Sequence, residues 1–260
     1  MDFVTSDANI IKTVNLVEED QDLEPMLIDM TGHGSAVAGI ISNINYDAEV
    51  YSVRVLDQND SSSFSRIAQG IYWCMENGVS IINMSFGTQT DSEILHQAIK
   101  DAYARGILMI AAAGNDPEAG VDYPAAYPEV MAVGSANDRW ERSANNASGP
   151  ETEILAPGEL VFVQSMLGLY TIVSGTSFAS AHVAGAASFQ WQRDMGKPAE
   201  FIRGLLKDSS NKAASDENNP AGILNVSAAQ EMFDSYEMKE EEPAESPEGT
   251  GTYDEGGSYG

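Results

Sequence analysis

Four runs of apolar residues, each about as long as a β-strand, alternate along the chain with segments of helical periodicity. The apolar runs cover residues 50–57, 78–87, 106–115 and 129–135, and the helical segments cover residues 65–78 and 91–106. Strands that are apolar at nearly every position must be covered on both faces, as in a parallel sheet between two layers of helices. The pattern therefore predicts an α/β fold, with helices flanking a mainly parallel central sheet and a functional site at the carboxyl ends of its strands.

Composition indicates a globular protein with an acidic surface. The 260 residues carry a formal net charge of -27, and 43% of them are hydrophobic. Nucleic acids and anionic membrane surfaces are therefore disfavoured as partners, because binding to them requires clustered Lys and Arg. The negative charge fits two interpretations, a well-solvated surface or a preference for basic partners.

The cysteine content and the two ends of the chain predict a location and a domain boundary. The first residues lack the basic and apolar regions of a signal peptide, no apolar run is long enough to span a bilayer, and Cys74 is the only cysteine. These features predict a cytoplasmic protein, with a secreted or processed form as the alternative. From residue 234 the chain is rich in Glu, Gly, Pro and Ser, so we expect a folded domain over residues 1–233 and an acidic disordered tail over residues 234–260.

Three short motifs carry residues that are capable of chemistry, and each also allows a simpler interpretation. His33 stands between Gly32 and Gly34 at the start of a helical segment. It is either a general base or a structural histidine. Asn115 follows a predicted strand. It is either part of a plain turn or an amide donor to an oxyanion. Ser177 stands at the start of a helical segment of small residues. It is either a helix cap or a nucleophile near the positive end of the helix dipole.

Together and in this order, the motifs resemble those of the subtilisin-like serine proteases (peptidase S8, the subtilases), and in particular the intracellular type of bacterial subtilisin. The resemblance rests on GHGSAVAG (32–39), AAAGN (111–115) and GTSFASAHVAG (175–185), and it extends over residues 9–233. It implies a three-layer subtilisin-like fold with Ser177 as nucleophile, His33 as general base and Asn115 as oxyanion donor. It also implies a cis peptide bond before Pro124.

The resemblance further implies an edge that pairs with an extended substrate and a primary specificity pocket beside it. The residues that would form them are Ser85, Phe86, Gly87, Ala113, Gly114 and Asp122. By the match of YPAAYP (123–128), Asp122 falls near the pocket floor and Asp116 near its rim. Both carboxylates are either solvated loop residues or the origin of a preference for Lys or Arg before the scissile bond.

One part of the family pattern is absent from this sequence. The catalytic Asp of the family ends the first core strand in an Asp-Thr/Ser-Gly motif, and residues 9–20 already resemble the segment that follows it. We therefore expect the first core strand to be missing from the sheet, with the Asp lost or supplied by a second polypeptide. Asp2 has no preceding strand to hold it, and Asp29 resembles a structural acidic neighbour of the His motif.

These observations leave two functions open. The first is a serine endopeptidase that cleaves a peptide or protein substrate by acyl transfer. The alternative is a catalytically impaired pseudoprotease that binds peptides or a partner protein through the same groove. We expect no cofactor and no metal, because Asp47 and Glu49 are too few oxygen ligands for the calcium loop that many relatives carry at this place.

Overall fold

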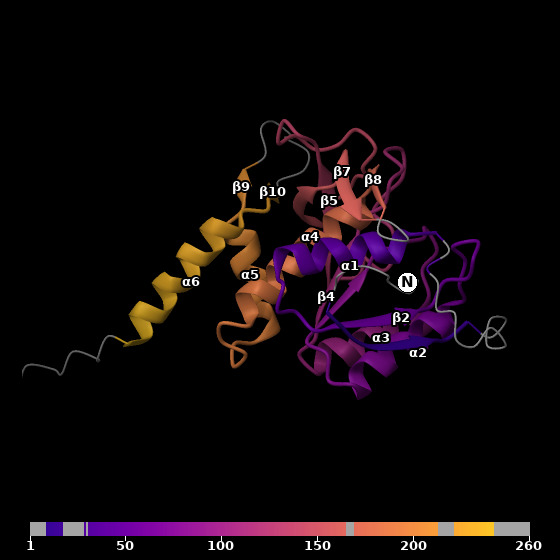
Figure 1. Cartoon of the computed structure of the whole chain (residues 1–260), viewed down its shortest axis with the longest axis horizontal. Helices are drawn as coiled ribbons and strands as arrows, with labels where there is room; N and C mark the ends of the chain where they lie inside the picture. The colour runs from indigo at the N-terminus through magenta and orange to yellow at the C-terminus, as the bar shows by residue number, and fades with distance from the viewer. Residues whose placement is uncertain (1–8, 18–28, 30, 165–168, 213–220, 242–260) are drawn as a thin grey trace, which may run out of the picture.

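The computed structural model describes residues 9–17, 29, 31–164, 169–212 and 221–241, and it arranges them in three layers (Figure 1). The middle layer holds a six-stranded sheet in the order β3-β4-β5-β6-β10-β9 and a separate pair, β1-β2. The strands of these sheets are β1 (Ile10–Asn15), β2 (Val50–Arg54), β3 (Ile81–Met84), β4 (Leu108–Ala112), β5 (Val130–Ala136), β6 (Thr152–Pro157), β9 (Asn211–Lys212) and β10 (Gly222–Ile223). Every pairing is parallel except that of β9 with β10, which confirms the prediction of a mainly parallel sheet.

Helices cover both faces of the sheet. They are α1 (His33–Ile44), α2 (Phe64–Glu76), α3 (Glu93–Ala104), α4 (Thr176–Trp191), α5 (Ala199–Asp208) and α6 (Val226–Glu241). A small antiparallel hairpin, β7 (Val161–Gln164) with β8 (Tyr170–Val173), lies between β6 and α4 in the chain. Among the described residues, no helix is both long and apolar enough to cross a membrane.

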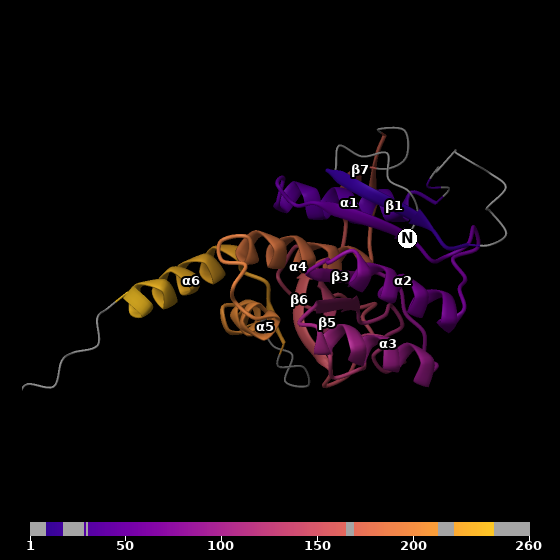
Figure 2. The same ribbon diagram turned by 90° about the horizontal axis from the view of Figure 1, so that it is seen from below.

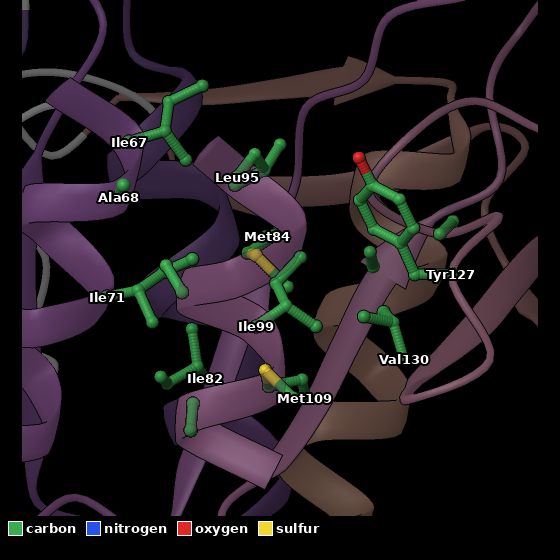
Figure 3. Packing of buried hydrophobic residues seen from close by; sticks show 14 of the residues in the cluster. Ile67, Ala68, Ile71, Ile82, Met84, Leu95, Ile99, Met109, Tyr127 and Val130 are labelled. Atoms are coloured by element: carbon green, nitrogen blue, oxygen red, sulfur yellow. The ribbon is translucent and has the colours of Figure 1, made fainter. Parts of the chain in front are cut away.

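The side chains of β4 explain why its sequence is apolar at every position. Met109 and Ala111 pack into a core shared with α2 and α3, which Figure 3 shows from close by. Leu108 and Ile110 point the opposite way, into a second core formed with α4, α5 and α6. Because successive side chains of a strand alternate between faces, a sheet covered on both sides requires a continuous apolar run.

The predicted helix over residues 91–106 is confirmed as α3, and its ends have physical causes. The Ser92 hydroxyl accepts a hydrogen bond from the backbone N–H of Leu95, and so caps the amino end of the helix. Gly106 follows the last turn with a φ of 76°, a conformation that glycine adopts without steric cost.

The start predicted for the disordered tail is wrong, because α6 continues past residue 234 to Glu241. The Arg193 guanidinium forms ion pairs with Asp234 and Glu237, and Tyr236 packs against the Phe201 ring. Partners that lie far away in the sequence thus hold a segment whose own composition gives no apolar period. The remainder of the predicted tail, residues 242–260, lies outside the described residues.

The pair β1-β2 stands apart from the six-stranded sheet. β1 and β2 pair only with each other among the described strands, and β3 is the first strand of the larger sheet. In Figure 2, β1 lies beside α1 and away from β5 and β6. The middle layer is therefore interrupted between β2 and β3.

The amino end of α1 is fixed by a buried carboxylate. Asp29 has no exposed surface, and it accepts hydrogen bonds of 2.7 Å from the backbone N–H groups of Gly32 and Ser35. An anion at the positive end of a helix is stabilised both by these N–H groups and by the helix dipole. The structure therefore gives Asp29 the structural role predicted from its place beside the His motif.

We expect Asp29→Ala to lower the free energy of unfolding by about 1–3 kcal/mol, because it leaves two buried N–H groups without their acceptor. Urea denaturation followed by circular dichroism measures the change. Asp138→Ala, which removes an exposed carboxylate from a turn, is the matched control and should stay within about 0.5 kcal/mol of the parent. Equal stability of the two variants would contradict the capping role.

Candidate active site

His33 is the first residue of α1, and the backbone holds it there at the carboxyl side of the sheet. Gly32 precedes it in the left-handed conformation, with a φ of 77°. The imidazole is half-buried, and it contacts the edge of the Phe178 ring at 5.7 Å between centroids. Burial lowers the pKa of His33 below its ordinary value. A neutral imidazole at pH 7 has the unprotonated nitrogen that a general base requires.

Ser177 is the second residue of α4, and it does not cap that helix. The N-cap position belongs to Gly175, and no side chain caps the helix there. The Ser177 hydroxyl donates a hydrogen bond of 3.0 Å to the backbone carbonyl of Ser85, just beyond β3. In return, the Ser85 hydroxyl donates to the backbone carbonyl of Ser177 at 2.9 Å. The start of α4 is thereby locked to the carboxyl end of a core strand.

Asn115 follows β4 and is oriented by Thr176. Its Oδ1 accepts hydrogen bonds from the Thr176 backbone N–H at 2.8 Å and from the Thr176 hydroxyl at 3.1 Å. The same hydroxyl accepts from the backbone N–H of Gly114 at 3.2 Å. Because both bonds use the amide oxygen, the Nδ2 donor of Asn115 is left for another acceptor. A Cβ atom placed on Gly175 would lie 3.6 Å from this Nδ2, so the donor lies close to the turn that leads into Ser177.

The two loops that carry residues predicted for the specificity pocket are held side by side. Thr88 and Tyr123 exchange backbone hydrogen bonds of 2.9 and 2.8 Å, and the Asp122 N–H donates to the Ala113 carbonyl at 2.8 Å. The peptide bond between Tyr123 and Pro124 is cis, as predicted. These bonds bring the segment after β3 against the segment after β4.

Asp122 lies between the two glycines of these segments. A Cβ atom on Gly87 would come within 2.6 Å of the Asp122 side chain, and one on Gly114 within 2.5 Å. Gln89 donates its amide N–H to Asp122 Oδ1. Burial raises the pKa of Asp122 above its ordinary value, and the charge of Asp116 adds to this shift. The carboxylate is therefore partly desolvated and fixed in position.

The structure places the other predicted edge residues in different environments. Ser85 is buried and Gly87 is exposed, so that only part of the edge is accessible from outside. The Phe86 side chain packs against the core beneath α2 and α3, and it also lines a cavity between β2 and β3. The Phe86 ring is therefore partly buried.

Sequence reasoning missed two residues that organise the site. Thr176 is fully buried and joins the loop after β4 to the start of α4. Gln89 holds the carboxylate of Asp122. The only sequence signal for Thr176 is its place directly before Ser177, and Gln89 has none, because both act on residues that are distant in the chain.

The His33 ring has no carboxylate partner among the described residues. Asp29 and Asp60 raise its pKa only through their charge, and Asp29 uses its oxygens to cap α1. Asp2, which the sequence analysis considered for the place of the catalytic Asp, lies outside the described residues. The site thus includes the His33 imidazole, the Ser177 hydroxyl and the Asn115 amide, and no described carboxylate binds the imidazole.

Comparison with known proteins identifies a family. The model of the subtilase family (Peptidase_S8) matches residues 5–227. An alkaline protease from Alkalihalobacillus alcalophilus is 37% identical over 217 residues, which cover 79% of this chain and 57% of the relative. Subtilisin Savinase from Lederbergia lenta is 37% identical over 79% of this chain and 80% of its own length. The chain therefore spans little more than half of the first relative and about four fifths of the second.

Two solved structures have the same fold. A cold adapted subtilisin-like serine proteinase superposes with a TM-score of 0.76 at 29% identity, over 84% of this chain and 81% of its own. The prenylagaramide maturation protease PagA superposes with a TM-score of 0.75 at 27% identity, over 87% of this chain and 86% of its own. The fold, the family model and the relatives agree, and this chain belongs to the subtilase family of serine proteases.

Proposed function

We propose that the chain is a serine endopeptidase that uses Ser177 as its nucleophile, His33 as its general base and Asn115 as an oxyanion donor. The observation that carries the proposal is the convergence of three elements at one point. The starts of α1 and α4 and the end of β4 meet there, because Phe178 contacts His33 and Thr176 binds Asn115. A nucleophile, a base and a donor on rigid elements form the constellation that acyl transfer requires.

The reaction assigns one step to each residue. The Ser177 hydroxyl leaves the Ser85 carbonyl and gives its proton to a ring nitrogen of His33, while its oxygen bonds to the carbonyl carbon of the scissile peptide. The Asn115 Nδ2 and the N–H groups at the start of α4 stabilise the negative charge on the carbonyl oxygen. His33 then protonates the leaving amine as the bond from carbon to nitrogen breaks. In the second half of the reaction, His33 takes a proton from water, the water oxygen bonds to the acyl carbon, and Ser177 leaves with the proton from His33.

The second candidate function, a pseudoprotease that binds peptides, is favoured by two observations. No described carboxylate contacts the His33 ring, and the Ser177 hydroxyl is turned toward Ser85. In subtilisin itself, loss of the catalytic Asp alone lowers kcat by about 10⁴-fold. The two functions therefore differ in whether an Asp reaches His33, and in either one the segments after β3 and β4 receive the peptide.

The location within or outside the cell stays a prediction. The sequence predicted a cytoplasmic protein, whereas one relative, at 41% identity over 66% of this chain, is a minor extracellular protease of Bacillus subtilis.

We also propose that Asp122 directs cleavage to bonds that follow Lys or Arg. Its carboxylate lies between the backbones of Gly87 and Gly114, where any larger residue than glycine would collide with it. A partly buried carboxylate that has lost water gains most from a cationic partner, through a charge-assisted hydrogen bond. Gln89 offers one neutral donor and leaves the charge of the carboxylate uncompensated.

Ser177→Ala should abolish covalent labelling by a fluorophosphonate, because the probe bonds to the nucleophilic oxygen. Asn115→Ala should slow the acylation rate by about 10²–10³-fold, the usual loss for one oxyanion donor. Intact-protein mass spectrometry measures both. Ser174→Ala, three residues away, is the control and should label like the parent. Labelling of Ser177→Ala, or unchanged acylation of Asn115→Ala, would refute the assigned roles.

Asp122 should make peptidyl phosphonates with Arg at the reacting position label Ser177 about 10–100-fold faster than those with Leu, since a charged hydrogen bond contributes about 1.5–3 kcal/mol. Asp122→Gly should remove the preference, and Asp116→Gly, at the exposed rim, should leave it nearly unchanged. The ratio of the Arg and Leu rates should fall on acidification at a pH above 3.8, because burial raises the pKa of Asp122 and only its charged form attracts Arg. A faster Leu probe with the parent chain would overturn the specificity.

A further inference from the structure

The outer face of the β7-β8 hairpin carries a group of exposed apolar side chains. Phe162 and Ile172 lie opposite each other in the two strands, and the rings of Phe162 and Tyr170 stack with 5.0 Å between their centroids. Leu160 and Leu169 stand directly before β7 and β8. These five residues form the hairpin patch, and each of them is between 61% and 67% exposed.

The inner face of the same hairpin is already covered. Val161, Val163 and Val173 pack with residues of α1 and with Phe178 in a small core of their own. Both strands therefore carry apolar residues on both faces, as β4 does, but only the inner face is buried. A two-stranded hairpin is marginally stable by itself, and strands that are apolar on both faces normally have a layer on each side. The hairpin patch thus marks a surface that a further apolar layer can cover.

The hairpin lies in the part of the chain that has no charged side chains. Residues 160–192 contain no Asp, Glu, Lys or Arg, whereas 20% of the whole chain is charged. A partner that is selected by ion pairs would find no charged group within the patch to bind. The patch can offer the burial of apolar area, and exposed apolar patches on a polar surface are typical of places where proteins associate.

We propose that the hairpin patch is the docking surface for a second copy of this chain, which binds with its own hairpin patch across a two-fold axis. Five large side chains exposed to this extent leave on the order of 600 Å² of accessible surface on each copy. Two copies then bury about 1,200 Å² between them, which is the lower limit of specific interfaces. Because the patch is uncharged and apolar, it is complementary to itself, as a two-fold interface requires.

The two hairpins pack as the two layers of a small β-sandwich. Apolar sheet faces stack about 10 Å apart with their strands nearly aligned. The rings of Phe162 and Tyr170 already hold each other by stacking, so that little side-chain freedom is lost when the second copy docks. In Figure 2, β7 lies at the periphery of the molecule beside α1, where a second molecule can approach it.

The formal net charge of -27 on each copy opposes the dimer and sets its dependence on salt. Salt screens this repulsion, because the Debye length falls from about 10 Å at 0.1 M to about 3 Å at 1 M. The dimer therefore becomes tighter as salt is added. A complex held by ion pairs with a basic partner becomes weaker under the same change.

The dimer also bears on the candidate active site. β8 ends at Val173, and the backbone N–H of Gly175 donates to the carbonyl of Gly158, before β7, at 2.7 Å. A second copy that covers the hairpin therefore stabilises the turn that leads into Ser177. The docking itself does not rest on the proposed endopeptidase function, which the labelling of Ser177 tests separately.

The first test measures the mass of the full chain by sedimentation velocity over a concentration series that spans the expected Kd of about 1–100 µM. We expect a monomer–dimer equilibrium whose Kd falls by at least about threefold between 0.1 M and 1 M NaCl. The double variant Phe162→Thr, Ile172→Thr should weaken the dimer by at least about 30-fold, because each copy loses two anchors of the patch. Circular dichroism checks that this variant is folded.

The matched control removes two exposed apolar side chains from α3. The double variant Ile94→Gln, Tyr103→Gln should keep the Kd of the dimer within about twofold of the parent.

The second test identifies the surface by cross-linking with a short bismaleimide. Gln164 pairs with Tyr170 in the hairpin, so that Gln164→Cys places a thiol within the outer face and keeps every residue of the patch. The native Cys74 does not compete, because it is buried and burial raises the pKa of its thiol to about 12. Gln164→Cys should give a covalent dimer on a denaturing gel, and Gln97→Cys, on the exposed face of α3, should not.

A chain that stays monomeric throughout the series at both salt concentrations would overturn the proposal. A dimer that persists in the Phe162→Thr, Ile172→Thr variant, or that cross-links through Gln97→Cys and not through Gln164→Cys, would show that another surface is used. Flotation of a monomeric chain with phosphatidylcholine vesicles, lost in the same double variant, would assign the patch to a lipid surface instead of a second copy.

Discussion

The hydrogen bonds that tie the start of α4 to the ends of β3 and β4 position everything else at the site. Ser177 binds the Ser85 carbonyl, and Thr176 binds Asn115. A helix start fixed in this way presents its N–H groups, the Ser177 hydroxyl that we propose as nucleophile and the amide of Asn115 toward one volume. The same bonds set the spacing between the segments after β3 and β4, and so the place of Asp122 between their glycines.

Much of the fold could be predicted from the sequence, because a sheet buried on both faces leaves a strong local pattern. The apolar runs around β2, β3, β4 and β5 and the cap of α3 at Ser92 are local signals of this kind. The extension of α6 beyond residue 234 could not be predicted, since it depends on Arg193 and Phe201, which are remote in the sequence. The apolar periodicity of a segment shows which of its own side chains are buried. It does not show which residues from distant parts of the sequence contact the segment.

Some residues of the candidate site could likewise be predicted from the local sequence, and others could not. His33 and Asn115 stand next to glycines, and Ser177 follows Gly175 by two residues, so that each could be found from nearby residues at the end of an element. Thr176 and Gln89 could not, because their partners lie 61 and 33 residues away. The capping of α1 by Asp29 is intermediate, since the acceptor and its N–H donors lie within six residues of one another.

The interruption between β2 and β3 has a physical cost that the rest of the chain has to tolerate. Open strand edges with apolar walls favour association with any available strand, including that of a second copy. The formal net charge of -27 opposes association between copies, and it does not oppose the approach of a basic segment. The acidic composition therefore limits association between copies at the open edges.

Amide hydrogen exchange read by NMR tests the central claim most directly, because it reports whether the backbone groups at the interruption are bonded. In the chain alone, we predict that the amides of Val53 and Asn83 exchange far faster than those of β4, which is paired on both sides. Strong protection of Val53 and Asn83 in the chain alone, equal to that of β4, would contradict an open sheet.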